Sequence, residues 1–227
     1  MTIDIISVQP EMFRGFLEQS MVARAVKKGL CDVRIHDLRD FAHDRWRKVD
    51  DKPYGGGPGM LMMCAPWFEA VEHCVAGAPS EGLRVVMTTP AGRRFTQRMA
   101  EEFSRATHLV FMCGHYEGFD DRIRTLATDE VSIGDFVMTG GELAAAAMAD
   151  SVVRLLPGVL GGGPAATASE SFGRGGLLEA PQYTHPPVFR GMAVPEVLLS
   201  GDHRRIDAWR RCEAMRITEQ NRPDLLP

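Results

Sequence analysis

The chain has 227 residues, of which 44% are hydrophobic and 25% charged, and its formal net charge is −4. These values are typical of a soluble globular protein with one large domain, or one medium and one small domain. They do not by themselves indicate a nucleic-acid partner, because basic residues cluster locally but acidic residues interleave with them.

Three further features limit the cellular setting. The longest uncharged apolar run, Leu143–Ala149, is far shorter than the ~20 residues of a membrane span. The amino terminus carries Asp4 within its first apolar run, so we expect no secretory signal and a cytoplasmic protein. The five cysteines form no C-x-x-C pair, which argues against a disulfide framework or a zinc site and favours a reducing compartment.

Short apolar runs alternate with segments of helical character in the first two thirds of the chain. The runs predict buried strands over Ile3–Val8, Leu83–Met87 and His108–Cys113. The intervening segments predict helices over Met12–Lys28, Pro66–Ala76 and Phe95–Ser104. This alternation indicates an α/β domain with a largely parallel sheet.

The composition changes after an alanine-rich segment, Glu142–Leu155, which predicts a buried helix that stops at Pro157-Gly158. A Gly-rich linker is expected over 161–176, and a Pro-rich stretch and a helix over Asp202–Ile217 follow it. The predicted organisation is a ligand-binding α/β domain over 1–160, a flexible linker over 161–176 and a small helical domain over 177–227.

Three glycine-rich segments are candidates for a ligand site: 53–60 (PYGGGPGM), 114–122 (GHYEGFDDR) and 133–142 (IGDFVMTGGE). None has the Gly-Lys-Ser/Thr ending of a phosphate loop. The nearest dinucleotide fingerprint, at 161–166, follows a helix instead of a strand, which disfavours a dehydrogenase. Because glycine lets a backbone approach a ligand closely, the three segments predict a shared pocket.

Longer motifs carry a resemblance to a known family. The segments YGGGPGMLM, GHYEGFDDRI, SIGDFVMTGGEL, RLLPGVLG, LLEAPQYTHP and VPEVLLSGDHRRIDAWR occur in this order along the chain. In order and spacing the chain resembles the bacterial tRNA (guanine-N1) methyltransferases of the TrmD family, from residue 3 to about residue 216. The resemblance implies a SPOUT-type parallel sheet with a deep trefoil knot, and a homodimer with active sites at its interface. It also implies methyl transfer from S-adenosylmethionine to N1 of the guanosine immediately 3′ of the anticodon.

The same resemblance implies a set of site residues. The S-adenosylmethionine site would be formed by Thr88, Thr89, Pro90, Gly92, Gly114, Tyr116, Glu117, Ile133, Gly134, Phe136, Met138, Gly140 and Gly141. The tRNA would contact Arg45, Asp50, Tyr54, Gly59, Ser171 and Tyr183, with further backbone contacts from an arginine-rich helix. The family's need for Mg²⁺ makes Glu117 the candidate metal ligand, although the spacing offers no cage of oxygen ligands.

Methylation of guanine N1 requires removal of its proton and stabilisation of the negative charge that grows on O6. The resemblance assigns the second role to Arg154, in RLLPG, and the first to an aspartate in the linker. This chain has Glu170 at that linker position, so the expected base carries one additional methylene. It also has His185 in YTHP, where the family usually has arginine.

Two other functions stay open from the sequence. One is a related knotted methyltransferase that acts on another RNA, and the other is a non-catalytic RNA-binding protein with the same fold. Methylation assays with tRNAs that differ only in the base 3′ of the anticodon would distinguish the first alternative from a tRNA (guanine-N1) methyltransferase. A test for S-adenosylmethionine binding would distinguish the second.

Overall fold

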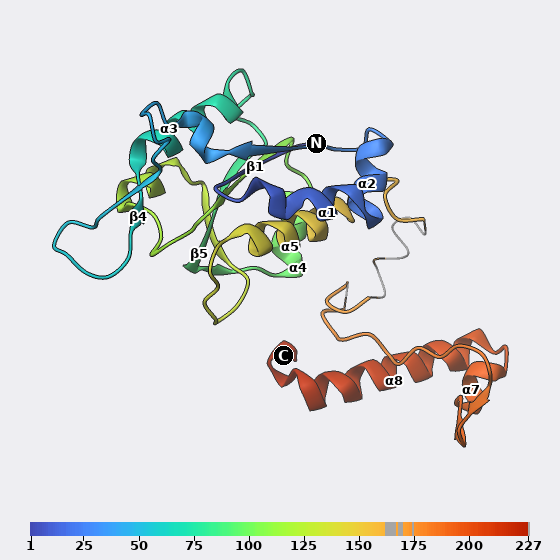
Figure 1. The fold of residues 1–227 in the computed structure, drawn as a ribbon. Coiled ribbons are helices and arrows are strands. Elements are labelled where there is room, and N and C mark those ends of the chain that lie inside the picture. The colour runs from blue at the N-terminus through green and yellow to red at the C-terminus, as the bar shows by residue number, and fades with distance from the viewer. Residues whose placement is uncertain (162–166, 168–169, 174, 227) are drawn as a thin grey trace. The chain divides into compact units, whose positions relative to one another are not determined.

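A computed structural model describes residues 1–161, 167, 170–173 and 175–226 (Figure 1). The chain divides into two compact units, Met1–Gly161 and Gly162–Pro227, which are described separately below. In the described parts of the chain, no helix has both the length and the apolar character needed to cross a membrane.

The first unit is built on a five-stranded sheet with the order β2-β1-β6-β5-β7. All four pairings are parallel. The strands are β1 (Thr2–Ser7), β2 (Asp32–Asp37), β5 (Leu83–Arg94), β6 (His108–Cys113) and β7 (Asp129–Ser132). The prediction of an α/β domain with a largely parallel sheet is confirmed, as are the three predicted strands within it.

Helices cover both faces of this sheet. One face packs against α2 (Ser20–Lys27), α4 (Gln97–Phe103) and α5 (Glu142–Val153), and the other packs against α3 (Cys64–Val75) with the 3-10 turns η2 (Leu38–Phe41) and η3 (Asp121–Leu126). Side chains of the central strands alternate between the faces, so Phe111 faces α5 while Met112 faces α3. Every residue of β6 is buried, which explains its continuous apolar sequence.

The structure differs from the predicted elements in the first helix, in both edge strands and in the length of β5. The expected helix over Met12–Lys28 is divided into η1 (Pro10–Phe13), α1 (Arg14–Glu18) and α2, because Gln19 is extended and Ser20 has a φ of 61°. The edge strands β2 and β7 were not predicted, since both carry several charged residues. Strand β5 extends beyond Met87 to Arg94, and its pairing with β7 shifts register between Thr88 and Arg93. Pairing is thus interrupted over 89–92, at the carboxyl end of the sheet.

Short elements complete both units. In the first unit, β3 (Asp50–Asp51) pairs antiparallel with β4 (Leu61–Met62) around the YGGGPGM segment. The second unit contains the β8 (Val188–Phe189) and β9 (Met192–Ala193) hairpin, α7 (Glu196–Leu199), α8 (His203–Asn221) and η4 (Pro223–Leu225). Helix α8 begins as predicted, because the Asp202 carboxylate caps its first turn, and it ends four residues beyond the predicted Ile217. Half of the predicted linker lies outside the described residues, and its flexibility stays a prediction.

Candidate functional site

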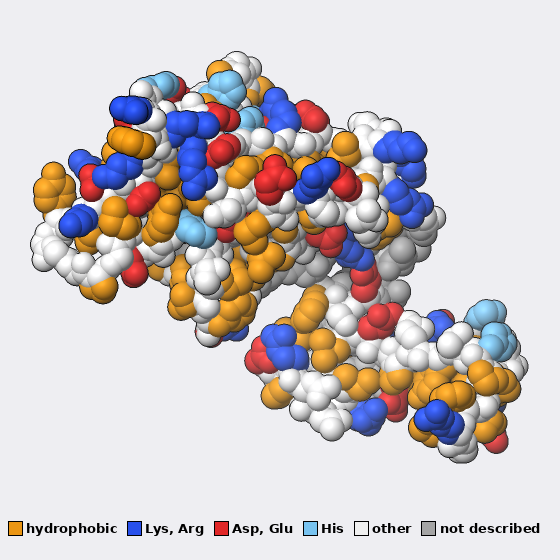
Figure 2. Space-filling model, in the orientation of Figure 1, with side chains coloured by type: hydrophobic (Ala, Val, Ile, Leu, Met, Phe, Trp, Pro, Cys, Tyr) orange, Lys and Arg blue, Asp and Glu red, His pale blue; other side chains and the backbone are white. Residues whose placement is uncertain are grey.

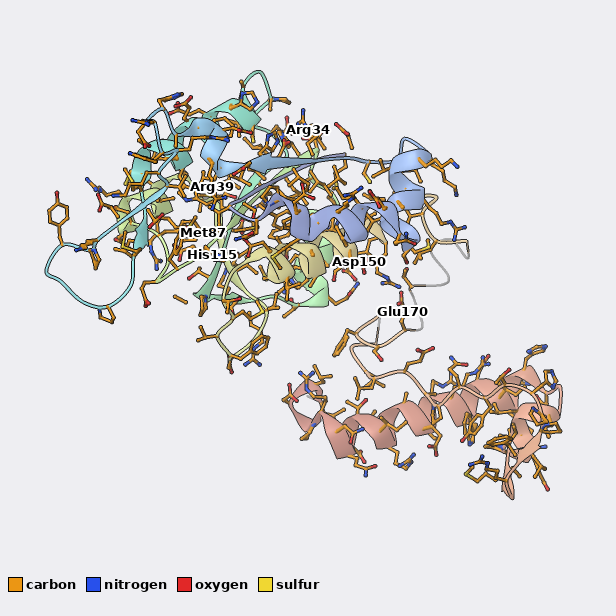
Figure 3. All side chains as sticks on the ribbon, viewed as in Figure 1. Arg34, Arg39, Met87, His115, Asp150 and Glu170 are labelled. Carbon is orange, nitrogen blue, oxygen red and sulfur yellow. The ribbon has the colours of Figure 1, made fainter. Side chains whose placement is uncertain are left out.

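Three loops meet at the carboxyl edge of the sheet because β6, β5 and β7 are adjacent strands. The loops, 88–92, 114–119 and 133–141, surround a pocket of about 310 Å³. Figure 3 labels Met87 and His115, which both border it. The carboxyl edge of a parallel sheet is where α/β proteins bind small ligands.

Backbone contacts hold the loops together. The amide of Gly141 donates to the Gly114 carbonyl at 2.7 Å, and residues 115 and 140 form an isolated antiparallel bridge. The buried Thr88 hydroxyl donates to the Met112 carbonyl at 2.9 Å and accepts from the Gly114 amide at 3.2 Å. A Cβ at Gly141 would overlap the Thr88 hydroxyl and lie 2.9 Å from the Gly114 nitrogen. Glycine is therefore required where the third loop crosses the first two.

The pocket gathers most of the residues that the resemblance assigned to the cofactor. Those lining it are Thr88, Thr89, Pro90, Gly114, Tyr116, Glu117, Ile133, Gly134, Phe136, Met138, Gly140 and Gly141. Gly92 does not line it. A Cβ at Gly92 would meet the backbone of Glu130 and Val131, so its small size allows β5 to rejoin β7.

The pocket also includes residues that the sequence did not single out. His115 and Asp121 lie within the GHYEGFDD motif and could have been found there, whereas Arg124 follows the motif, in η3. Val137 and Thr139 belong to the third loop, and Val137 is largely exposed. Arg124 could not be assigned, because only the tertiary structure brings its side chain to the pocket.

The second loop also contacts the YGGGPGM segment. The Glu117 amide donates to the Met60 carbonyl at 3.0 Å, and a Cβ at Gly59 would overlap the Glu117 side chain. Tyr116 has a φ of 58°. Partial burial raises the pKa of the Tyr116 hydroxyl, and the negative charge of the nearby Asp50 adds to this effect. Asp50 and Gly59 thus adjoin the pocket-forming loop.

The other predicted tRNA contacts of the first unit lie on its surface. Tyr54 is fully exposed at the tip of the glycine-rich segment. Arg45 is exposed, and its guanidinium carbon lies 5.1 Å from the centre of the Trp46 ring. On the face shown in Figure 2, Lys and Arg side chains are interspersed with Asp and Glu over both units, as the composition indicated.

The two predicted catalytic residues lie in different units. Arg154 caps the carboxyl end of α5, where its amide donates to the Asp150 carbonyl at 3.0 Å. Glu170 belongs to the second unit, and its carbonyl accepts from the Gly173 amide at 2.9 Å. Whether the two side chains meet stays a prediction.

The remaining predicted contacts also belong to the second unit. The Ser171 hydroxyl accepts from the Glu179 amide at 2.9 Å, and the half-exposed Tyr183 ring lies 6.4 Å from the Trp209 ring. Their distance to the pocket also stays a prediction.

The role of Glu117 as a magnesium ligand stays a prediction, and the structure shows no cage of protein ligands around it among the described residues. Magnesium prefers several oxygen ligands in octahedral geometry. Among the described residues, Glu117 belongs to no group of three closely spaced histidine, cysteine, aspartate or glutamate side chains.

A pocket lined by glycines at the carboxyl edge of a parallel sheet is typical of α/β proteins that bind a small organic ligand, and the protein is of this class. The model of a family described as tRNA (Guanine-1)-methyltransferase TrmD matches residues 1–227. The chain is 54% identical to the tRNA (guanine-N(1)-)-methyltransferase of Geobacillus kaustophilus, with 100% of this chain and 91% of the relative aligned. It is 52% identical to the enzyme of the same name from Lactiplantibacillus plantarum, again over 100% and 91% of the two chains. The counterpart from Dehalococcoides mccartyi is 53% identical over 100% and 90%. The chain belongs to the tRNA (guanine-1) methyltransferase family.

Proposed function

We propose that the protein transfers a methyl group from S-adenosylmethionine to N1 of the guanosine immediately 3′ of the anticodon in tRNA. The observation that carries this proposal is that residues 87–90 and two of the family motifs, GHYEGFDDRI and SIGDFVMTGGEL, line one pocket in a chain whose whole length matches the family. The names of its relatives specify the same substrate class and the same guanine atom.

S-adenosylmethionine would be held by the loops 88–90, 114–117 and 133–141. Their glycines leave backbone amides and carbonyls accessible to a purine ring and a ribose, and the side chains of Ile133 and Met138 add apolar contact. When bound, this cofactor supplies an electrophilic methyl group. The protein's own residues would then bind and orient the cofactor and remove the proton from guanine N1.

Two side chains would interact with the guanine during methyl transfer. Glu170 would accept the N1 proton, a role worth roughly 10²–10⁴-fold in rate. Arg154 would donate hydrogen bonds to O6, where the negative charge grows as N1 attacks.

A trefoil knot and a homodimer are part of the same proposal. The segment after β7 passes the ends of β5 and β6, where Gly141 bonds Gly114, before α5 packs against β1 and β6. Such a crossing is compatible with a knotted carboxyl-terminal part. In a dimer, Glu170 and Arg154 could come from different subunits. Mixing an inactive Arg154 variant with an inactive Glu170 variant should then restore part of the activity, and no rescue despite subunit exchange would exclude shared sites.

The second unit would bind the tRNA backbone through the exposed arginines of α8, which include Arg204, Arg205, Arg210 and Arg211. Contacts of this kind predict an affinity that falls as salt rises. The proposed setting is the cytoplasm, where tRNA is modified and where five free cysteines are compatible with a reducing compartment.

The proposal is tested by mass spectrometry of tRNA after incubation with the protein and S-adenosylmethionine. A transcript with guanosine 3′ of the anticodon should gain one N1-methyl group, and the same transcript with adenosine there should gain none. Methylation of a different RNA or position would instead favour a related methyltransferase. Absence of cofactor binding by calorimetry would leave only a non-catalytic RNA-binding role.

A further inference from the structure

A second cluster of reactive side chains lies apart from the pocket, around Asp4 on β1. Asp4 is completely buried and points to the α3 face of the sheet. Its neighbours are Arg34 and His36 from β2, His108 from β6 and Cys74 from the last turn of α3. Figure 3 shows Arg34 well separated from the pocket residue His115.

The two oxygens of Asp4 have different partners. Oδ2 accepts from Arg34 Nη2 at 2.7 Å and lies 2.6 Å from His108 Nε2. Oδ1 lies 2.6 Å from His36 Nε2. The donor atoms of Asp4, His36 and Cys74 all lie within 4.8 Å of one another. One carboxylate oxygen is thus held in place while the other shares a small space with an imidazole nitrogen and a sulfur.

We propose that Asp4, His36 and Cys74 form a binding site for a zinc-class divalent cation. A carboxylate oxygen, an imidazole and a thiolate are the three ligand types that Zn²⁺ takes in proteins, and water can complete the tetrahedron. Bond lengths of about 2.0–2.3 Å place such donors about 3.5 Å apart. On binding, Asp4 Oδ1 and His36 Nε2, which lie 2.6 Å apart, would therefore separate by about 1 Å, and a side-chain movement of Cys74 would bring its sulfur to a matching distance.

The surroundings resemble a built metal site. Bound metal ligands are usually oriented by a second set of hydrogen bonds, and Arg34 and His108 supply these to Asp4 Oδ2. His36 is 18% exposed while Asp4 is fully buried, which gives an ion access from one side only. The metal would join α3 to two strands of the sheet.

The electrostatic environment favours the ionised form of one ligand and disfavours that of another. Burial is the largest influence on the pKa of Asp4 and would raise it, but hydrogen bonds from His36, His108 and Arg34 together outweigh burial and lower the pKa. Burial and the Asp4 charge raise the pKa of the Cys74 thiol to about 12, which works against metal binding, because the cation must displace a proton from sulfur.

The sequence disfavoured a zinc site because no two cysteines are closely spaced. That argument concerns sites built from paired cysteines, whereas this cluster uses a single cysteine and ligands from residues 4, 36 and 74. The rival interpretation is a purely structural ion-pair network, in which Asp4 is neutralised by Arg34 and the histidines and no metal binds. The proposal does not depend on the proposed function, because the cluster shares no residue with the pocket.

The test uses the full chain, stripped with a chelator and titrated with Zn²⁺ and, as a spectroscopic probe, Co²⁺. One equivalent of each should bind per chain, and Co²⁺ should give the near-ultraviolet charge-transfer absorption of a thiolate ligand. Cys74→Ala should abolish that absorption, whereas Cys31→Ala, which removes a buried cysteine outside the cluster, should keep it. His108→Gln should weaken Zn²⁺ binding by about 10–100-fold.

Absence of the thiolate absorption in the wild-type chain after one equivalent of Co²⁺ would overturn the proposal, even if the Cys74 variant cannot be purified. Equal Zn²⁺ affinity in the wild type and a folded Cys74→Ala variant would also overturn it. Circular dichroism of the metal-free proteins checks that each variant is folded.

Discussion

Gly141 is the position where the structure makes the sharpest prediction about the pocket. In Gly141→Ala, the new methyl group would overlap the Thr88 hydroxyl and lie 2.9 Å from the Gly114 nitrogen. Gly141 has a φ of −86°, which alanine adopts readily, so backbone strain is not the issue. Relief of the overlap requires the third loop to move away from the first two.

The expected cost follows from this contact. Overpacking of one methyl group in a tight site costs about 1–3 kcal/mol of unfolding free energy. For a chain of this size that corresponds to a melting temperature lower by about 2–12 °C. The displacement would also weaken the Gly141–Gly114 hydrogen bond. If S-adenosylmethionine uses these loops, each 1.4 kcal/mol of lost binding energy weakens its affinity by about tenfold.

Calorimetric titration with S-adenosylmethionine and thermal unfolding of the free protein measure the two effects separately. Gly15→Ala is the matched control, because Gly15 lies in α1 with no atom within 4 Å of an added Cβ. It should leave affinity unchanged and stability unchanged or slightly higher. A Gly141→Ala protein as stable as the wild type would refute the packing argument. Lowered stability with unchanged affinity would instead place the cofactor elsewhere.

Three further predictions concern chemistry and pH. Arg154→Lys should keep cofactor affinity but lose single-turnover methyl transfer, because an ammonium group cannot reproduce the planar, two-pronged hydrogen bonding of a guanidinium. Near-normal turnover of this variant would remove Arg154 from the mechanism. Glu170→Gln should slow single-turnover methyl transfer by at least about 10²-fold at neutral pH without changing tRNA affinity, and the rate should partly recover in mild alkali. An unchanged rate at neutral pH would mean that another residue removes the N1 proton. Hydrogen bonds from the amides of Lys48 and Trp46 lower the pKa of the Asp44 carboxyl in the folded protein. The ionised carboxylate therefore stabilises the fold fully above the ordinary pKa near 3.8, and this stabilisation is lost as pH falls through the lower, folded-state pKa. Asp44→Ala should thus destabilise the protein at pH 7 and converge with the wild type in acid denaturation; a pH-independent difference would contradict this.

The sequence alone determined the parts of the fold that depend on local composition. The apolar runs at the centre of the sheet are buried on both faces, so their residues specify strands regardless of context. The N-cap at Asp202 and the alanine-rich segment likewise specify helices through local hydrogen bonding and propensity. The motif order was sufficient to indicate the family.

The tertiary structure decided what depends on residues distant in sequence. Strand β7 is recognisable only because β5 pairs with it, and Gly92 is small because the backbone of that strand passes beside it. The buried charge of Asp4 was equally unpredictable, because its partners come from β2, β6 and α3 and meet only after the sheet has formed. Local pattern fixes an element, but which polar groups face one another inside the protein depends on packing, because a buried charge is stable only where the fold supplies its partners.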